Sequence, residues 1–252
     1  MCRNISSTSV PCLVHLFLMG LVLCSGCIGN QDPVALGDAY FADGKYMHAL
    51  SQYRAAMQEQ PENAEIYLKE GITLFSLVRY EDAITAFTAA IRLDPHSAEA
   101  HYLKGRTSYM MGDYDEAVRS FYKALELNQA NADYWYYRGL ALTDRGQHES
   151  ALDHFNKALL LDPLHELSWS GKAKALMRQN NNNNNNNEAL DAIDKAIDLN
   201  PKNAQHWINK AQILEKLYLF DEADVAYEYA TMLLRQQADE ITRHFPLSSR
   251  QI

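Results

Sequence analysis

The sequence predicts an all-α solenoid, in which six helix–turn–helix repeats stack side by side and a helix caps the C-terminal end. The first observation is that four sets of identical residues recur along the sequence at one spacing, which is the interval from Phe87 to Phe121. Each such set is called a column here. The columns are Phe87, Phe121 and Phe155; Gly71, Gly105 and Gly139; Ala83, Ala117 and Ala151; and Ala90, Ala124 and Ala158. Four columns with one period indicate structural repeats. The second observation is that each period contains two stretches of helical spacing around a turn.

The segment 98–131 shows the order of elements within one period. Apolar and small residues at helical spacing predict a first helix that ends near Met111. Gly112 follows, and glycine commonly ends helices because it adopts positive φ at little cost. The pair Asp115–Glu116 opens a second helix, where negative charge offsets the helix dipole. The residues expected to cap first helices are Asn63, Ser97, Asn131 and Asn203.

These columns resemble those of the tetratricopeptide repeat. In the second period they are Tyr67, Gly71, Leu74, Ala83, Phe87, Ala90 and Pro95. The resemblance implies a right-handed α-solenoid superhelix with repeats at 30–63, 64–97, 98–131, 132–165, 166–203 and 204–237. Departures from the family pattern occur at His101, Ser108, Gln129 and Ile193. Residues 238–252 are expected to form the end of the capping helix and a tail.

A run of eight asparagines, residues 180–187, interrupts the fifth repeat. The interval from Pro163 to Pro201 exceeds the period by four positions. Asparagine tolerates left-handed backbone conformations and caps helices. We therefore expect the run to form a long turn between the two helices of this repeat, with a partner-binding loop as the alternative.

The segment 1–27 has the layout of a signal peptide. Arg3 supplies a positive charge, residues 12–24 form an apolar run that is short for a transmembrane helix, and small residues precede Cys27. Leu23 and Ser25 to Cys27 resemble a lipobox, with Cys24 where that motif usually has leucine. The resemblance implies lipidation of Cys27 and a protein tethered to the outer face of a cell membrane. The alternatives are a secreted protein, a single N-terminal membrane anchor, and a cytoplasmic protein whose true start lies downstream.

The repeats offer no evident catalytic, cofactor-binding or metal site, and we expect no enzyme. All four cysteines lie in the segment 1–27, so the repeats hold no disulfide, thiolate metal site or cysteine nucleophile. The tryptophans share one repeat position and the carboxylate pairs share another, so both are expected to serve the fold. The nine histidines show no metal-ligand spacing. A net charge of −9 argues against nucleic acid as a partner.

The family resemblance implies a peptide groove on the concave face, which first-helix side chains line. The corresponding residues are Tyr102, Arg106, Tyr109, Met110, Tyr136, Leu140, Thr143, Lys174 and Met177. Aromatic, methionine and basic side chains suit an extended peptide of acidic or apolar character. The lysine–asparagine clamp that some family members use for chaperone tails is not reproduced at the matching positions, Val34, Asp38, Lys69 and Ile72.

Taken together, the resemblance implies a non-catalytic scaffold that binds a protein or peptide partner without a cofactor. The N-terminal segment leads us to expect such a scaffold in an envelope, secretion or pilus assembly at a membrane. Two other classes stay open. One is a regulatory subunit or cofactor of an envelope enzyme, and the other is a cytoplasmic co-chaperone, which requires the signal peptide to be false.

Overall fold

The computed structural model describes residues 32–179 and 183–244, and these residues form twelve α-helices and no β-strand. In chain order the helices are α2 (Pro33–Ala42), α3 (Tyr46–Glu59), α4 (Ala64–Ser76), α5 (Tyr80–Leu93), α6 (Ala98–Met110), α7 (Tyr114–Leu127), α8 (Ala132–Asp144), α9 (His148–Leu161), α10 (Glu166–Arg178), α11 (Asn183–Leu199), α12 (Ala204–Lys216) and α13 (Phe220–His244). The predicted all-α fold is confirmed. The predicted signal segment 1–27, with Cys27, lies outside the described residues.

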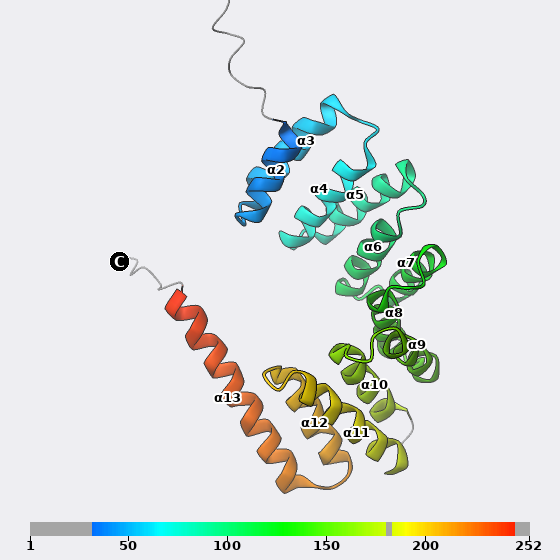
Figure 1. Cartoon of the computed structure of the whole chain (residues 1–252), viewed down its shortest axis with the longest axis vertical. Coiled ribbons are helices and arrows are strands. Elements are labelled where there is room, and N and C mark those ends of the chain that lie inside the picture. The colour runs from blue at the N-terminus through cyan, green and yellow to red at the C-terminus, as the bar shows by residue number, and fades with distance from the viewer. Residues whose placement is uncertain (1–31, 180–182, 245–252) are drawn as a thin grey trace, which may run out of the picture.

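Consecutive helices pack in pairs, and the pairs stack into an open arc (Figure 1). α2 packs on α3, α4 packs on α5, and the pairing continues to α12 on α13. The first helix of a pair also contacts the first helix of the next pair, from α4 through α6, α8 and α10 to α12. These first helices line the inner, concave side of the arc, where Figure 1 shows α6 and α8 inside α7 and α9.

The glycine and phenylalanine columns meet inside each helix pair. A Cβ atom on Gly105 would lie 2.8 Å from the Phe121 ring, and one on Gly139 would lie 2.9 Å from the Phe155 ring. Glycine is therefore required for the two helices to approach this closely. Phe155 also fills the space beside Gly171 of the next pair, where a Cβ atom would lie 2.5 Å from the ring. Phe155 is fully buried and joins two neighbouring pairs.

Among the described residues, five of the turns inside the helix pairs contain one residue with positive φ. Gly112 is this residue in its pair, with φ of 80°, as the sequence predicts, and Gly44 and Gly146 do the same in their pairs. Val78 and Tyr218 occupy the equivalent place with φ of 60° and 63°. A non-glycine residue in the left-handed region costs about 1–2 kcal/mol. Both side chains are exposed, so the turn geometry and not side-chain packing imposes this conformation.

The predicted N-caps are confirmed at four of the first helices. Asn63, Asn131 and Asn203 each accept a hydrogen bond from the backbone N–H two residues later, and Ser97 accepts one from Ala100. The fifth repeat uses a cap that sequence reasoning did not find. There the Nδ1 atom of His165 accepts from the N–H of Ser168 at 3.2 Å, so an imidazole replaces the usual oxygen acceptor.

The expected long turn of asparagines is partly wrong, because α11 begins at Asn183 inside the run. α11 has 17 residues, whereas the preceding second helices α3, α5, α7 and α9 have 14. Asn186 is only 4% exposed, and Asn185 donates from Nδ2 to the carbonyl oxygen of Gln179 at 3.2 Å. The extra residues therefore lengthen the helix as well as the connection, because the apolar face beyond them holds the segment in helical register.

In the last repeat, the positions of the second helix that face the next pair in the other repeats carry polar residues, and the stack ends there. Two positions of each second helix face the next pair, and they are apolar in the first five repeats. The residues are Leu50, Ile84, Val118, Leu152 and Leu190 at one position, and Met57, Ile91, Leu125, Leu159 and Ile197 at the other. In α13 the same positions carry Asp224 and Thr231. α13 then continues to His244 with Leu234 half-exposed and Ala238 exposed, so the capping segment extends past the last pair and does not fold back over it.

Candidate functional site

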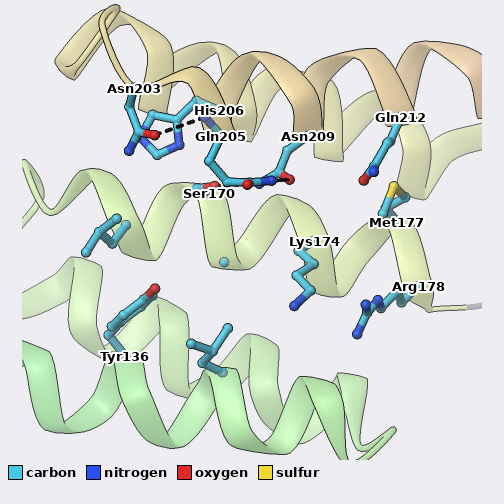
Figure 2. Close-up of a pocket in the computed structure, with 13 residues that line it drawn as sticks. Tyr136, Ser170, Lys174, Met177, Arg178, Asn203, Gln205, His206, Asn209 and Gln212 are labelled. Carbon is cyan, nitrogen blue, oxygen red and sulfur yellow. Dashed lines mark hydrogen bonds between the residues drawn. The ribbon is translucent and has the colours of Figure 1, made fainter. Parts of the chain in front are cut away.

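A pocket of about 360 Å³ opens on the concave side, where α8, α10 and α12 lie next to one another (Figure 2). α8 contributes Tyr136 and Leu140, and α10 contributes Lys174 and Met177. These four residues belong to the groove set that the sequence predicts. Tyr136 and Met177 also pack against the core of their own helix pairs, so this row lies where the packed interior meets the inner surface.

The α12 wall of the pocket consists of amide side chains. Gln205 donates from Nε2 to Oδ1 of Asn209 at 3.0 Å, and Asn209 donates from Nδ2 to Oγ of Ser170 on α10 at 3.0 Å. Gln212, one turn further along α12, is exposed and also lines the pocket (Figure 2). Amides offer both donors and acceptors, which are the groups that pair with the backbone of an extended peptide.

The two basic side chains of the pocket, Lys174 and Arg178, both pair with one carboxylate, that of Asp144, the last residue of α8. Lys174 Nζ lies 2.9 Å and Arg178 Nη1 lies 2.6 Å from Asp144 Oδ1. Tyr109 of α6 donates its hydroxyl hydrogen to Asp144 Oδ2 at 2.5 Å. Burial would raise the pKa of Asp144, but the bonds from Tyr109, Lys174 and Arg178 together hold that pKa below its ordinary value of 3.8. The expected attraction of this pocket for acidic peptides is therefore weaker than the sequence indicates.

A second concave cluster is centred on Arg106 of α6. Its guanidinium carbon lies 5.4 Å from the ring centre of Phe75, 5.7 Å from that of Tyr102 and 5.1 Å from that of Tyr137. Tyr102 also stacks on Tyr134 at 4.7 Å between ring centres. These distances are those of cation–π contacts and stacked rings.

The sequence-predicted groove residues thus fall into separate groups. Tyr136, Leu140, Lys174 and Met177 line the pocket, and Tyr102 and Arg106 belong to the aromatic cluster. Tyr109 bridges to Asp144, Thr143 is buried, and Met110 is 54% exposed at the end of α6. Sequence reasoning missed Asp144, although it follows Met110 by one period and precedes Arg178 by another.

His206 is a buried polar residue at the pocket edge that the sequence did not mark. It is 1% exposed, Asn203 donates from Nδ2 to its Nε2 at 3.2 Å, and its Nδ1 has no hydrogen-bond partner among the described residues. Burial lowers the pKa of His206, against the opposing influence of Glu166 at 3.6 Å. Burial therefore favours the neutral form of this imidazole.

The other candidate sites have structural roles in the described residues. The carboxylate pairs occupy the first turns of α5, α7 and α13. The indole N–H groups of Trp135, Trp169 and Trp207 each donate to a carbonyl oxygen six residues earlier. No group of three or more metal-ligating side chains occurs in residues 32–179 and 183–244. Within the same ranges no helix is long and apolar enough to cross a membrane.

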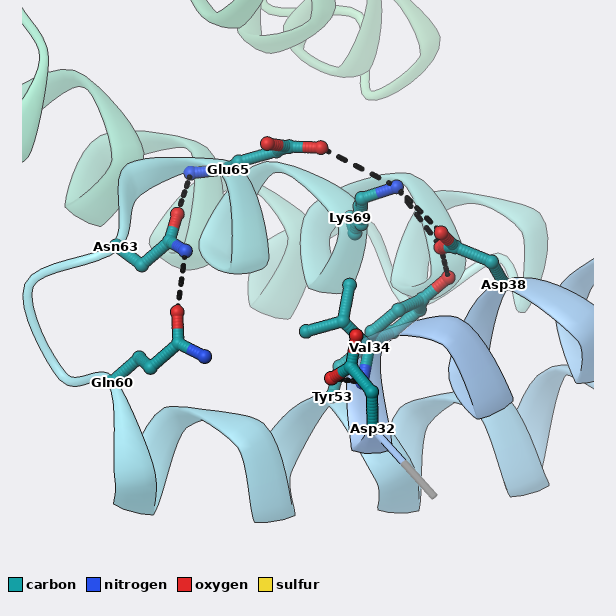
Figure 3. A network of polar contacts seen from close by, with 8 residues as sticks. All are labelled: Asp32, Val34, Asp38, Tyr53, Gln60, Asn63, Glu65 and Lys69. Atoms are coloured by element: carbon teal, nitrogen blue, oxygen red, sulfur yellow. Dashed lines mark hydrogen bonds and ion pairs between the residues drawn. The ribbon is translucent and has the colours of Figure 1, made fainter. Parts of the chain in front are cut away.

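In the N-terminal repeats, the ammonium group of Lys69 lies close to carboxylates of the protein itself (Figure 3). Lys69 Nζ lies 2.9 Å from Asp38 Oδ1 and 3.6 Å from Glu65 Oε1. Tyr53 donates its hydroxyl hydrogen to the same Asp38 oxygen at 2.7 Å. The ammonium group of Lys69 is thus bound by two carboxylates of the protein itself.

The family model described as tetratricopeptide repeat matches residues 34–98, 68–126 and 102–166, which together span more than half of the chain. The model described as protein prenyltransferase alpha subunit repeat matches residues 186–217. No curated protein matches the chain.

Solved structures with the same fold include MamA, YrrB and Tom70. One MamA structure is 26% identical, with a TM-score of 0.60, and the match covers 69% of this chain and 92% of that one. YrrB, described as a TPR protein with an unusual peptide-binding site, is 23% identical with a TM-score of 0.56, covering 72% and 91%. Yeast Tom70 is 23% identical with a TM-score of 0.57, covering 78% of this chain and 42% of Tom70.

Family membership follows from both kinds of match. The matched residues include the glycine and phenylalanine columns that hold the helix pairs together. Proteins with these repeats are generally non-catalytic scaffolds for protein interactions. The chain belongs to the tetratricopeptide repeat family.

Proposed function

We propose that this protein is a non-catalytic scaffold that binds an extended peptide segment of a partner protein on its concave face. The observation that carries the proposal is the pocket between α8, α10 and α12, which combines the aromatic and apolar side chains Tyr136, Leu140 and Met177 with an amide wall. Such a surface buries apolar side chains of a peptide and pairs with its backbone. The peptide-binding site of YrrB, a protein of the same fold, supports the same use of the fold.

Blocking the pocket is expected to weaken peptide binding without affecting the fold. Gln212→Trp places a large ring at the exposed rim of the pocket, so we expect at least a tenfold loss of affinity, which corresponds to about 1.4 kcal/mol. The measurement is binding of the protein to an array of random octapeptides, followed by fluorescence anisotropy on the peptides bound most tightly.

Gln58→Trp is the matched control, because Gln58 is an exposed glutamine of α3 outside the pocket. We expect it to bind the peptides as the wild type does. If Gln212→Trp also binds every peptide with unchanged affinity, the pocket is not the binding site. If the wild type binds no peptide on the array, the proposed function itself is wrong.

We also propose that the scaffold is held at the outer face of a cell membrane by a lipid on Cys27, within an envelope or secretion assembly. The support is the charged start, short apolar run and lipobox-like end of residues 1–27. Cys27→Ser is expected to move the full-length protein from the membrane fraction to the soluble fraction, whereas Cys24→Ser is not. Retention of Cys27→Ser in membranes would indicate a spanning anchor instead.

A further inference from the structure

Arg106 has no anionic partner among the described residues, although the neighbouring cations of the concave surface are paired. Lys69 contacts Asp38, and both Lys174 and Arg178 contact Asp144. Arg106 forms no hydrogen bond and no ion pair with the residues that the structure describes; its contacts are with the three aromatic rings. The five N–H donors of its guanidinium group are thus left without an acceptor from the described chain.

The aromatic rings hold this guanidinium in place and leave its hydrogen-bonding edge unused. Phe75, Tyr102 and Tyr137 come from α4, α6 and α8, so three successive repeats surround one arginine. Cation–π contacts are made through the faces of the rings and do not use the N–H donors. An arginine that is preorganised in this way loses less conformational entropy when a planar anion binds in the bidentate manner.

The cluster is continuous with the pocket of the proposed function. Tyr137 meets Tyr136 edge to face at 4.9 Å between ring centres, and Tyr136 lines the pocket. A peptide in the pocket that continues toward α6 therefore passes over Tyr136 and Tyr137 to reach Arg106. The hydroxyl groups of Tyr102 and Tyr137 form no hydrogen bond within the described residues and are further donors in the same cluster.

The charge of the site favours a carboxylate. Arg106 supplies one positive charge without an anionic partner among the described residues, whereas the next cations along the concave face, Lys174 and Arg178, both contact the carboxylate of Asp144. A single unpaired guanidinium matches the charge and planar shape of a carboxylate, whereas a phosphate dianion is usually met by several cations. We propose that Arg106, framed by Phe75, Tyr102 and Tyr137, binds a carboxylate of the peptide held in the neighbouring pocket, which rests on the proposed function.

The test compares matched peptides that differ only in one carboxylate. Octapeptides selected by the wild type are synthesised with each Glu or Asp changed to the amide, and with a free or an amidated C-terminus. Fluorescence anisotropy is expected to show that the wild type prefers one acid form by at least tenfold. Arg106→Gln is expected to remove that preference. Arg106→Met is expected to remove it as well, although this variant keeps an unbranched apolar side chain beside the aromatic rings.

Arg92→Gln is the control for a change of net charge, because Arg92 is an exposed residue at the end of α5. We expect it to keep the acid preference. If the wild type binds more weakly when one Glu or Asp side chain is changed to the amide, the carboxylate comes from that side chain. If it binds more weakly when the C-terminus is amidated, the carboxylate is the C-terminal one. Either result supports the site. If Arg106→Gln keeps the same acid preference, this inference is wrong while the proposed function stands. If the wild type binds no peptide, both this inference and the proposed function are wrong.

Discussion

Phe155→Ala is expected to reduce the free energy of unfolding by about 3–5 kcal/mol. Phe155 is fully buried and lies against Gly139 of its own pair and Gly171 of the next. Truncation leaves a cavity that neither glycine can fill, because neither has a side chain to move into it. Since repeats contact mainly their neighbours, the loss is expected to be local to α8, α9 and α10. Urea unfolding gives the size of the effect, and hydrogen exchange of these helices gives its location.

Leu160→Ala is the control for this prediction. Leu160 lies on the same helix, α9, but is 84% exposed, so its truncation is expected to change stability by less than about 0.5 kcal/mol. Similar losses in the two variants would show that burial between neighbouring pairs is not what makes Phe155 important. Faster exchange spread evenly over all helices would contradict the local, neighbour-to-neighbour description of the stack.

The fold could be predicted from the sequence because its main contacts repeat. Gly105 and Phe121 lie on the two helices of one pair, and their close packing recurs wherever the same two residues recur. The caps at Asn63 and Asn131 and the turn at Gly112 follow from local residue preferences that recur in several repeats. Because the same contacts recur with the same residues, the period of the sequence predicts both the local caps and turns and the packing of the two helices in a pair.

The details of the candidate site could not be predicted in the same way, because they depend on contacts that occur once. Arg106 takes its surroundings from three repeats, and Lys174 forms an ion pair with Asp144 of the preceding repeat. His165 caps a helix although histidine is not a usual capping residue. The helical asparagines were missed for a related reason: their own preference is for turns, and packing of the residues after them overrides it.

The expected loss for Asp144→Asn is about 2 kcal/mol of stability at pH 7. The Asp144 side chain is 13% exposed and binds Tyr109, Lys174 and Arg178, so one carboxylate joins α6, α8 and α10. The amide keeps the shape of the side chain but loses the charge that makes the two ion pairs strong. Urea unfolding at pH 7 measures the difference. Asp153→Asn, at an exposed position of α9, is expected to change stability by less than about 0.5 kcal/mol.

The pH dependence of this difference identifies the carboxylate as its source. The folded-state pKa of Asp144 lies below its ordinary value of 3.8, so the unfolded chain binds the proton more readily than the folded one. The stability that Asp144 contributes is therefore fully present above about pH 5 and is lost as the pH falls through the folded-state pKa. We expect the curves of wild type and Asp144→Asn to run parallel from about pH 7 to 5 and to converge below about pH 4. A gap that stays constant to about pH 2 would mean that the loss comes from packing and not from charge.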